Sequence, residues 1–100
     1  MHFALFYDYV DDFMEKRVAL RNGHLKHAWD SHSHGQFQLG GVQDEPLDGA
    51  MLIFKVDSRK VVEDFVAADP YVTLGLVKSW RIRPWLTAAG TDASNPVYPD

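Results

Sequence analysis

Some segments of the chain have the spacing of apolar residues that is typical of strands, and others have the spacing typical of helices. The pattern therefore predicts a mixture of strands and helices. Stretches rich in aromatic and branched residues, or with alternating polarity, predict strands at residues 3–10, 36–39, 50–56 and 76–85. Helical spacing of apolar residues predicts helices at residues 12–34 and 58–68. The order is β-α-β-β-α-β, the split βαβ arrangement, in which a four-stranded antiparallel sheet carries two helices on one face.

The first helix is predicted to begin at Asp12, with Glu15 three residues later completing a capping box. Its apolar stripe is expected to face the sheet, and consists of Met14, Val18, Leu25 and Trp29 with His32. The Asn22-Gly23 pair interrupts the pattern and allows either a kink or a shorter helix that begins near Leu20.

Glycine, proline and acidic residues mark the connections between the later elements. Gly40-Gly41 is expected to form a bulge at the end of the second strand. The acidic turn at residues 44–49 joins the second and third strands into an antiparallel hairpin. Asp57 or Ser58 is expected to cap the second helix, which should stop at Ala68 because Asp69 precedes a proline.

The first and fourth strands are apolar on both sides. In the first strand, Phe3, Leu5 and Tyr7 alternate with Ala4 and Phe6. A sheet with one face in water would alternate to polar residues, so its outer face should be covered. A second copy packed sheet to sheet is the simplest cover, and the sequence therefore predicts a homodimer.

Composition and charge narrow the class of protein. With 100 residues, 46% apolar and 24% charged, the chain should fold as a globular domain. A net charge of −4 and a pI near 5.6 argue against nucleic acid as a partner. The lack of cysteine suits the cytoplasm and excludes thiolate chemistry. No apolar run is long enough for a membrane span, and the start does not resemble an export signal.

Candidate catalytic residues lie on the predicted first helix and at the end of the predicted second helix. Arg17, Arg21 and His24 recur at helical spacing beside the apolar stripe, where the arginines would favour a neutral, base-competent imidazole. The alternative is a solvated helix edge with a histidine at the core boundary. Asp69 is either a helix stop before Pro70 or a carboxylate that orients His24, and spacing alone does not show that the two meet.

Other candidates are weaker. An apolar pocket for a small molecule could be lined by Tyr7, Tyr9, Tyr71, Trp80 and Trp85, although aromatic residues in strands are more often core. The histidines of the first helix invite a metal site, but on a helical wheel His27 and His34 project away from His32. We therefore expect no metal and no cofactor.

Several short motifs together resemble one family. Residues 15–25, with the pattern R-x3-R-x2-H-L, the Gly40-Gly41 pair, and Ala68-Asp69-Pro70-Tyr71-Val72 followed by residues 75–77 resemble the YciI-like (YCII-related) family over about residues 3 to 86. The resemblance implies a ferredoxin-like α+β fold that dimerises through its sheets into a dimeric α/β barrel. It also implies that His24 and Asp69 form a catalytic dyad in a cleft, with Arg17 and Arg21 nearby.

The sequence departs from the family pattern in three places. Val42 stands where a proline often follows the glycines, the loop to the third strand is short and acidic, and residues 87–100 lie outside the match. We predict a domain at residues 1–86 followed by a tail at 87–100 that either frays or lies on a neighbour.

One branch of the family resembles enzymes that remove chloride from hydroxyquinol-type rings. The leading hypothesis is a cofactor-free enzyme in which His24 is the acid or base, Asp69 orients it, and Arg17 or Arg21 holds an anionic or phenolic group of a small cyclic or aromatic substrate. Isomerisation or elimination, including dehalogenation, would suit this chemistry. The alternatives are a non-catalytic dimeric module that binds a small ligand and a purely structural partner.

Overall fold

The computed structural model describes all residues, 1–100, and confirms the predicted order of strands and helices. The elements are β1 (His2–Tyr9), α1 (Phe13–Ser33), β2 (Phe37–Gln43), β3 (Gly49–Lys55), α2 (Arg59–Ala68), α3 (Pro70–Thr73) and β4 (Val77–Trp85). The short helix α3 was not predicted. For the backbone, Asp69 before Pro70 predicts the end of a helix, whereas an N-cap aspartate followed by proline also begins one.

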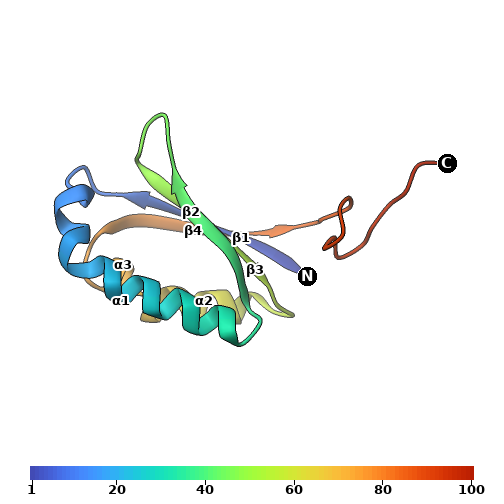
Figure 1. Ribbon diagram of the computed structural model, residues 1–100, viewed down its shortest axis with the longest axis horizontal. Helices are drawn as coiled ribbons and strands as arrows, with labels where there is room; N and C mark the ends of the chain where they lie inside the picture. Colours follow the sequence, from blue (N-terminus) through green and yellow to red (C-terminus); the bar gives the residue numbers. More distant parts are fainter.

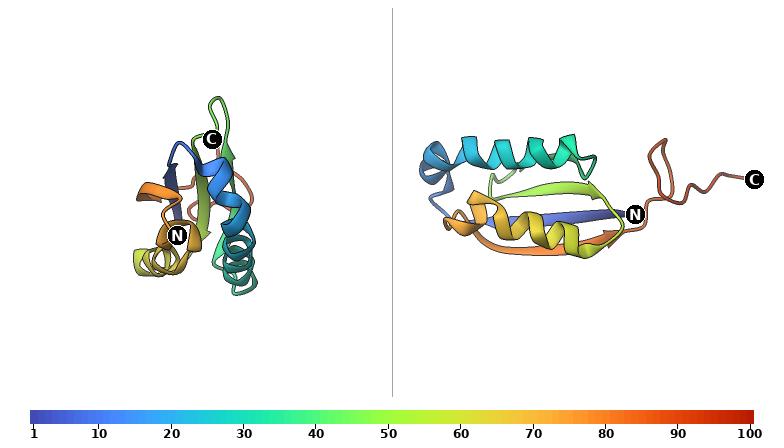
Figure 2. Two further views of the ribbon diagram at one scale, coloured as in Figure 1. Left: turned by 90° about the vertical axis from the view of Figure 1, so that its left-hand side faces the viewer. Right: turned by 90° about the horizontal axis from the view of Figure 1, so that it is seen from below.

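The four strands form one antiparallel sheet in the order β2-β3-β1-β4. Figure 1 shows α1, α2 and α3 together on one side of this sheet, and the view from below in Figure 2 shows α1 and α2 side by side across it. The predicted ferredoxin-like α+β fold is confirmed. No helix is both long and apolar enough to cross a lipid bilayer.

The core lies between the sheet and the helices. It consists mainly of the helix-facing side chains of β1 and β3 and of the buried face of α2: Phe3, Leu5, Tyr7, Ala50, Leu52, Phe54, Val62, Phe65 and Val66. These positions are two apart in the strands and three or four apart in the helix, as one buried face of each element requires. Burial of this continuous apolar layer holds the helices against the sheet.

The predicted orientation of α1 is wrong. Val18 is 85% exposed and Trp29 is 67% exposed, so the apolar stripe does not pack on the sheet. The side chains that are turned inward include Phe13, His24 and Ala28. The buried face is thus rotated by about a third of a turn from the predicted one.

Small residues and paired histidines explain this rotation. A Cβ on Gly23 would lie 3.3 Å from Cγ of Pro70, so the glycine lets α3 approach α1 closely. On the same face, His24 hydrogen-bonds Asp69 and His27 hydrogen-bonds the carbonyl of Phe65. A polar side chain with a partner can be buried at little cost, which a pattern of apolar residues does not register. The helix is continuous through Gly23, so neither the kink nor the shorter helix occurs.

Two local predictions also need correction. Asp12 is the N-cap of α1, but no side-chain hydrogen bond caps the helix, so the capping box with Glu15 does not form. The glycines do not end β2, which continues to Gln43, and the irregularity in its pairing lies earlier, between Phe37 and Leu39. The predicted antiparallel hairpin of β2 and β3 is confirmed.

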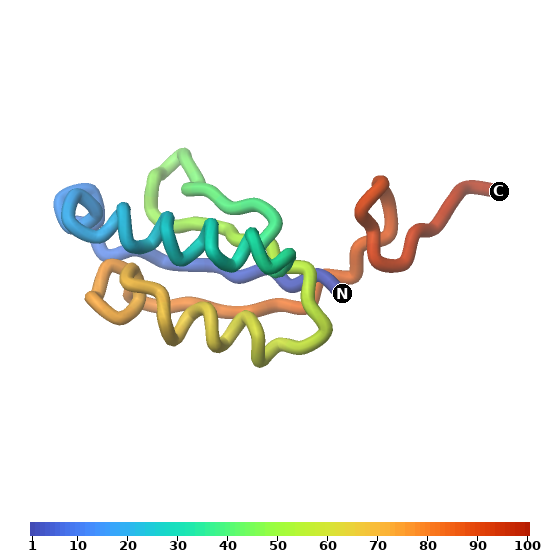
Figure 3. Tube along the Cα trace, turned by 60° about the horizontal axis from the view of Figure 1, so that its bottom comes forward, coloured from blue at the N-terminus to red at the C-terminus, as the bar shows by residue number.

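The tail at residues 87–100 leaves the end of β4 and extends away from the rest of the molecule (Figure 3). Its first part is attached to the start of β1. Nδ1 of His2 lies 2.8 Å from the hydroxyl of Thr87 and 3.0 Å from that of Ser94. Further along, Val97 is 71% exposed. The tail therefore begins in a fixed direction and ends with apolar side chains in solvent.

Candidate functional site

Asp69 occupies the junction between α2 and α3 and is completely buried. Its carboxylate accepts hydrogen bonds from the hydroxyl of Tyr7 (2.7 Å) and from the backbone N–H of Tyr71 (3.0 Å). Nδ1 of His24 lies 2.8 Å from Oδ1 and 3.0 Å from Oδ2 of the same carboxylate. These contacts from β1, α3 and α1 fix the carboxylate in one orientation.

His24 is held on α1 by Asp69 and by a flat contact with Tyr71. The two rings are parallel within 4°, with their centroids 3.9 Å apart. Since the carboxylate is an acceptor, the hydrogen-bond network places the ring proton of a neutral His24 on Nδ1. Nε2 then has no protein partner and can accept a proton from a ligand.

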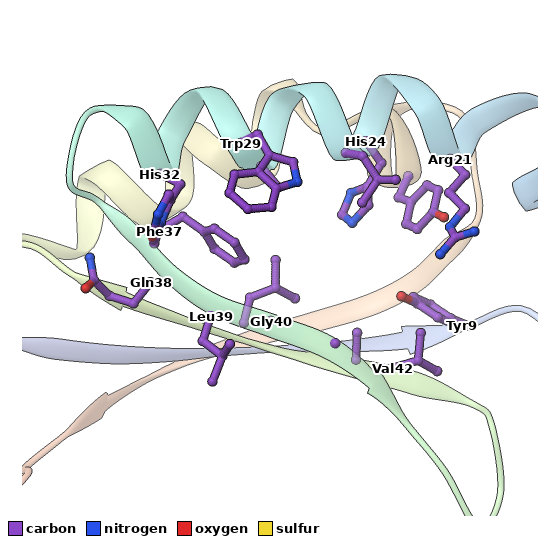
Figure 4. Close-up of a pocket in the computed structure, with 16 residues that line it drawn as sticks. Tyr9, Arg21, His24, Trp29, His32, Phe37, Gln38, Leu39, Gly40 and Val42 are labelled. Carbon is purple, nitrogen blue, oxygen red and sulfur yellow. The ribbon is translucent and has the colours of Figure 1, made fainter. Parts of the chain in front are cut away.

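A cavity of about 400 Å³ lies beside this histidine, between α1 and β2. Figure 4 shows Arg21, His24 and Tyr9 toward one end of the cavity and Trp29, Phe37 and His32 further along it. The later part of the apolar stripe of α1, with Leu25, Trp29 and His32, thus lines a cavity instead of the core. A small volume with mostly apolar walls and polar groups at one end suits a small cyclic molecule with a polar substituent.

Gly40 lies on β2 in the wall of the cavity, and its lack of a side chain leaves room there. A Cβ at this position would lie 2.9 Å from two ring carbons of Phe37 and 3.2 Å from Cγ of Leu52. Any side chain here would push the Phe37 ring, which itself lines the cavity. Gly40, predicted to form a bulge together with Gly41, therefore keeps space beside the strand.

Positive charge and tyrosine side chains surround the polar end. Burial raises the pKa of Tyr71 above its ordinary value, an effect that the nearby charges of Arg21 and Arg17 oppose. Burial also raises the pKa of Tyr9, as does the proximity of Tyr71 and Asp69. Both phenols therefore stay protonated at neutral pH and can donate hydrogen bonds. Neither arginine forms an ion pair within the chain.

Of the six site residues suggested by the sequence, His24, Arg21 and Tyr71 line the cavity. Asp69 lies behind His24 as its hydrogen-bond partner. Arg17 lies close enough to Tyr71 and Tyr9 to affect their pKa values but does not line the cavity. Tyr7 does not line it either, because its ring is 1% exposed and its hydroxyl points to Asp69. Its pKa is raised by burial and by the adjacent carboxylate.

Among the other aromatic residues suggested for a pocket, Tyr9 lines the cavity, whereas Trp80 and Trp85 do not. Tyr9 is two positions after Tyr7 and so shares its helix-facing side of β1, but it lies at the end of the strand, where the cavity opens. Sequence reasoning missed Trp29 as a cavity residue, because the apolar stripe of α1 is predicted to face the sheet.

The remaining histidines on α1 have separate hydrogen-bond partners. His27 bonds the carbonyl of Phe65, His32 that of Phe37, and His34 that of Asp30. They point to different neighbours, and no group of three or more His, Cys, Asp or Glu side chains is placed to share a metal ion.

The fold and this cavity define a ferredoxin-like α+β domain with a carboxylate-bound histidine beside a small cavity. The model of the YCII-related domain matches residues 1–86, and the chain therefore belongs to that family. An uncharacterised protein of Haemophilus influenzae is 23% identical over 94 residues, which cover 85% of this chain and 96% of that protein.

Two solved structures share the fold. The first, 5-chloro-2-hydroxyhydroquinone dehydrochlorinase of Burkholderia phenoliruptrix in complex with 2,5-dihydroxybenzoquinone, aligns with a TM-score of 0.73 and 22% identity over 88% of this chain and 96% of that one. The second, a NIPSNAP family protein of Agrobacterium tumefaciens, aligns with a TM-score of 0.58 and 19% identity over 97% of each chain.

Proposed function

We propose that this chain is a cofactor-free acid/base enzyme that isomerises a small cyclic or aromatic substrate or eliminates halide from it. The observation that carries the proposal is the buried Asp69 carboxylate bonded to Nδ1 of His24, with the imidazole beside a ring-sized cavity. A histidine that only filled the helix edge would need neither a fully buried carboxylate nor an open space beside its second nitrogen.

In the proposed reaction, Nε2 of His24 takes a proton from the substrate. The electron pair of the broken bond forms a new double bond in the ring system. In an elimination, halide leaves with its own bonding pair, whereas in an isomerisation the imidazolium returns the proton to another atom. Asp69 holds the ring in place and stabilises the charge that the imidazole gains, a role that contact with a buried carboxylate suits.

The walls of the cavity support the choice of substrate. Arg21 is unpaired within the chain and can attract an anionic or phenolic oxygen, with Arg17 adding positive charge nearby. Tyr71, stacked on His24, contributes a protonated phenol at the same end. The apolar walls suit the ring itself. The dehydrochlorinase supports this choice of substrate through the similarity of its fold.

Turnover of chlorinated hydroxyquinols and of cyclic lactones tests the proposal, with chloride release and ring absorbance as measurements. We expect His24→Gln to lower kcat by at least about 10²-fold, the usual contribution of a positioned base. Asp69→Asn should lower it too, because the charge that stabilises the imidazolium is lost. His34→Gln is the matched control, since His34 is exposed and distant from the cavity.

Unchanged turnover in both variants would overturn the enzymatic proposal. Stabilisation by such compounds without any product would instead favour the alternative, a non-catalytic module that binds a small ligand.

We also propose that the chain forms a homodimer through the face of the sheet opposite the helices. Two cross-strand rows on this face are apolar: Leu39, Ile53 and Ala4 form one, and Met51 and Phe6 form most of the other. Leu39 is exposed and Ile53, Met51 and Phe6 are partly exposed in a single chain, whereas Ala4 is already buried. The exposed apolar surface supports a covering partner. Cytoplasmic location and the absence of a nucleic-acid partner stay predictions from composition.

A further inference from the structure

Tyr9 is only 4% exposed as a residue, yet its hydroxyl forms no hydrogen bond within the protein. By contrast, the neighbouring buried phenol of Tyr7 is bonded to Asp69. Every fully buried side-chain oxygen or nitrogen in the structure has a partner, so the Tyr9 hydroxyl must be accessible from the cavity that the residue lines. An accessible, unpartnered hydroxyl on an otherwise buried ring indicates a ligand or solvent position.

The ring of Tyr9 is fixed by its neighbours. It packs edge to face on Tyr71, with centroids 6.1 Å apart, and contacts Phe13 at a tilt of 40°, with centroids 4.9 Å apart. In Figure 4 its oxygen points toward the cavity, on the opposite side from His24. The hydroxyl is thus held in one place by packing alone, and no protein group in the cavity wall competes for its proton.

The groups near this hydroxyl restrict what it can bind. Arg21 provides an unpaired positive charge at the same end of the cavity, and Nε2 of a neutral His24 is an acceptor without a partner. A protonated phenol beside a guanidinium donates to an oxygen that carries negative charge, as a phenolate or a quinone enolate does. An apolar ring would leave both donors unsatisfied.

We infer that the hydroxyl of Tyr9 is the hydrogen-bond donor that holds a ring oxygen of the ligand at the polar end of the cavity. This assignment rests on the proposed function and narrows the substrate class to hydroxylated or quinonoid rings, with the ring oxygen between Tyr9 and Arg21. It makes Tyr9, rather than Tyr7, the tyrosine of β1 that contacts substrate.

Equilibrium binding of two probes tests the assignment without requiring turnover. 2,5-Dihydroxybenzoquinone carries ionised ring oxygens, and toluene is a ring of similar width without any acceptor. Tyr9→Phe should weaken binding of dihydroxybenzoquinone by about 10- to 100-fold, the effect of a lost hydrogen bond to a charged group. Binding of toluene should change by less than about twofold, because the ring of Phe keeps the packing.

The exposed Tyr98 of the tail offers a matched control, and Tyr98→Phe should bind both probes like the wild type. Equal weakening of both probes in Tyr9→Phe would show that the residue acts through packing, and unchanged binding of dihydroxybenzoquinone would show that it contacts no oxygen. Either result overturns the assignment and leaves the acid/base proposal standing. Failure of the wild type to bind dihydroxybenzoquinone would also overturn the assignment, whereas the acid/base proposal is decided separately by turnover of hydroxyquinols and lactones.

Discussion

At the scale of single residues, Asp69 organises the candidate site. One carboxylate ends α2, caps α3 and binds side chains from β1 and α1, so the same group that shapes the backbone also orients the imidazole. Both of its oxygens are used, Oδ2 by Tyr7 and Oδ1 by the N–H of Tyr71. A buried carboxylate is tolerated only with such partners. Stability and proposed activity therefore depend on the same contacts.

The hydrogen bond from Tyr7 to Asp69 can be removed without a change of ring packing. Tyr7→Phe takes away the 2.7 Å bond and leaves one oxygen of a buried carboxylate with weaker support. We expect the free energy of unfolding to fall by about 1–3 kcal/mol, measured by urea denaturation. Tyr98→Phe should leave it unchanged, because that ring is 79% exposed. A Tyr7→Phe protein as stable as the wild type would show that Asp69 does not depend on this donor.

At the scale of elements, the orientation of α1 decides whether a cavity exists. The helix contacts α3 through Gly23 and binds Asp69 through His24, and this leaves Leu25 and Trp29 facing β2 across open space. If the apolar stripe faced the sheet, as its spacing suggests, these side chains would fill that space. The cavity thus exists because the helix packs through small and hydrogen-bonded residues.

A pair of valines tests this orientation. Val18 is 85% exposed on α1 and Val62 is fully buried on α2, so the same substitution should act very differently at the two sites. We expect Val18→Ser to change the free energy of unfolding by less than about 0.5 kcal/mol and Val62→Ser to lower it by several times that amount. Comparable losses at both positions, measured by urea denaturation, would mean that α1 buries its apolar stripe after all.

The sequence predicts some features of the fold and of the candidate site but not others. The strands, the hairpin and the end of α2 follow from local patterns, because alternation and a proline act within a few residues. The pairing of His24 with Asp69 joins positions 45 residues apart, and local spacing does not predict it. The resemblance to a family indicated that pair. The rotation of α1 escaped prediction because histidines count as polar although hydrogen bonds let them face inward.

At the scale of the whole molecule, the helices lie on one face of the sheet and the other face carries no helix (Figure 2). Across that helix-free face, Leu39, Ile53 and Ala4 align from β2 to β1, and the row ends at Arg83 on β4. In the next row, Arg81 lies over the ring of Phe6 at 4.6 Å. An apolar band with a charged border is suited to self-association about a twofold axis.

The mass in solution tests this assembly. One chain has a mass of 11.4 kDa, so light scattering should give about twice that value for the wild type. Ile53→Asp places a charge in the middle of the apolar band and should shift the protein to monomer, since an unpaired charge is costly to bury in an interface. Val18→Asp adds the same charge to the exposed side of α1 and should leave the dimer intact. A wild-type protein that stays monomeric at high concentration would leave the apolar band without a role in self-association, and the candidate site would then have to be complete within one chain.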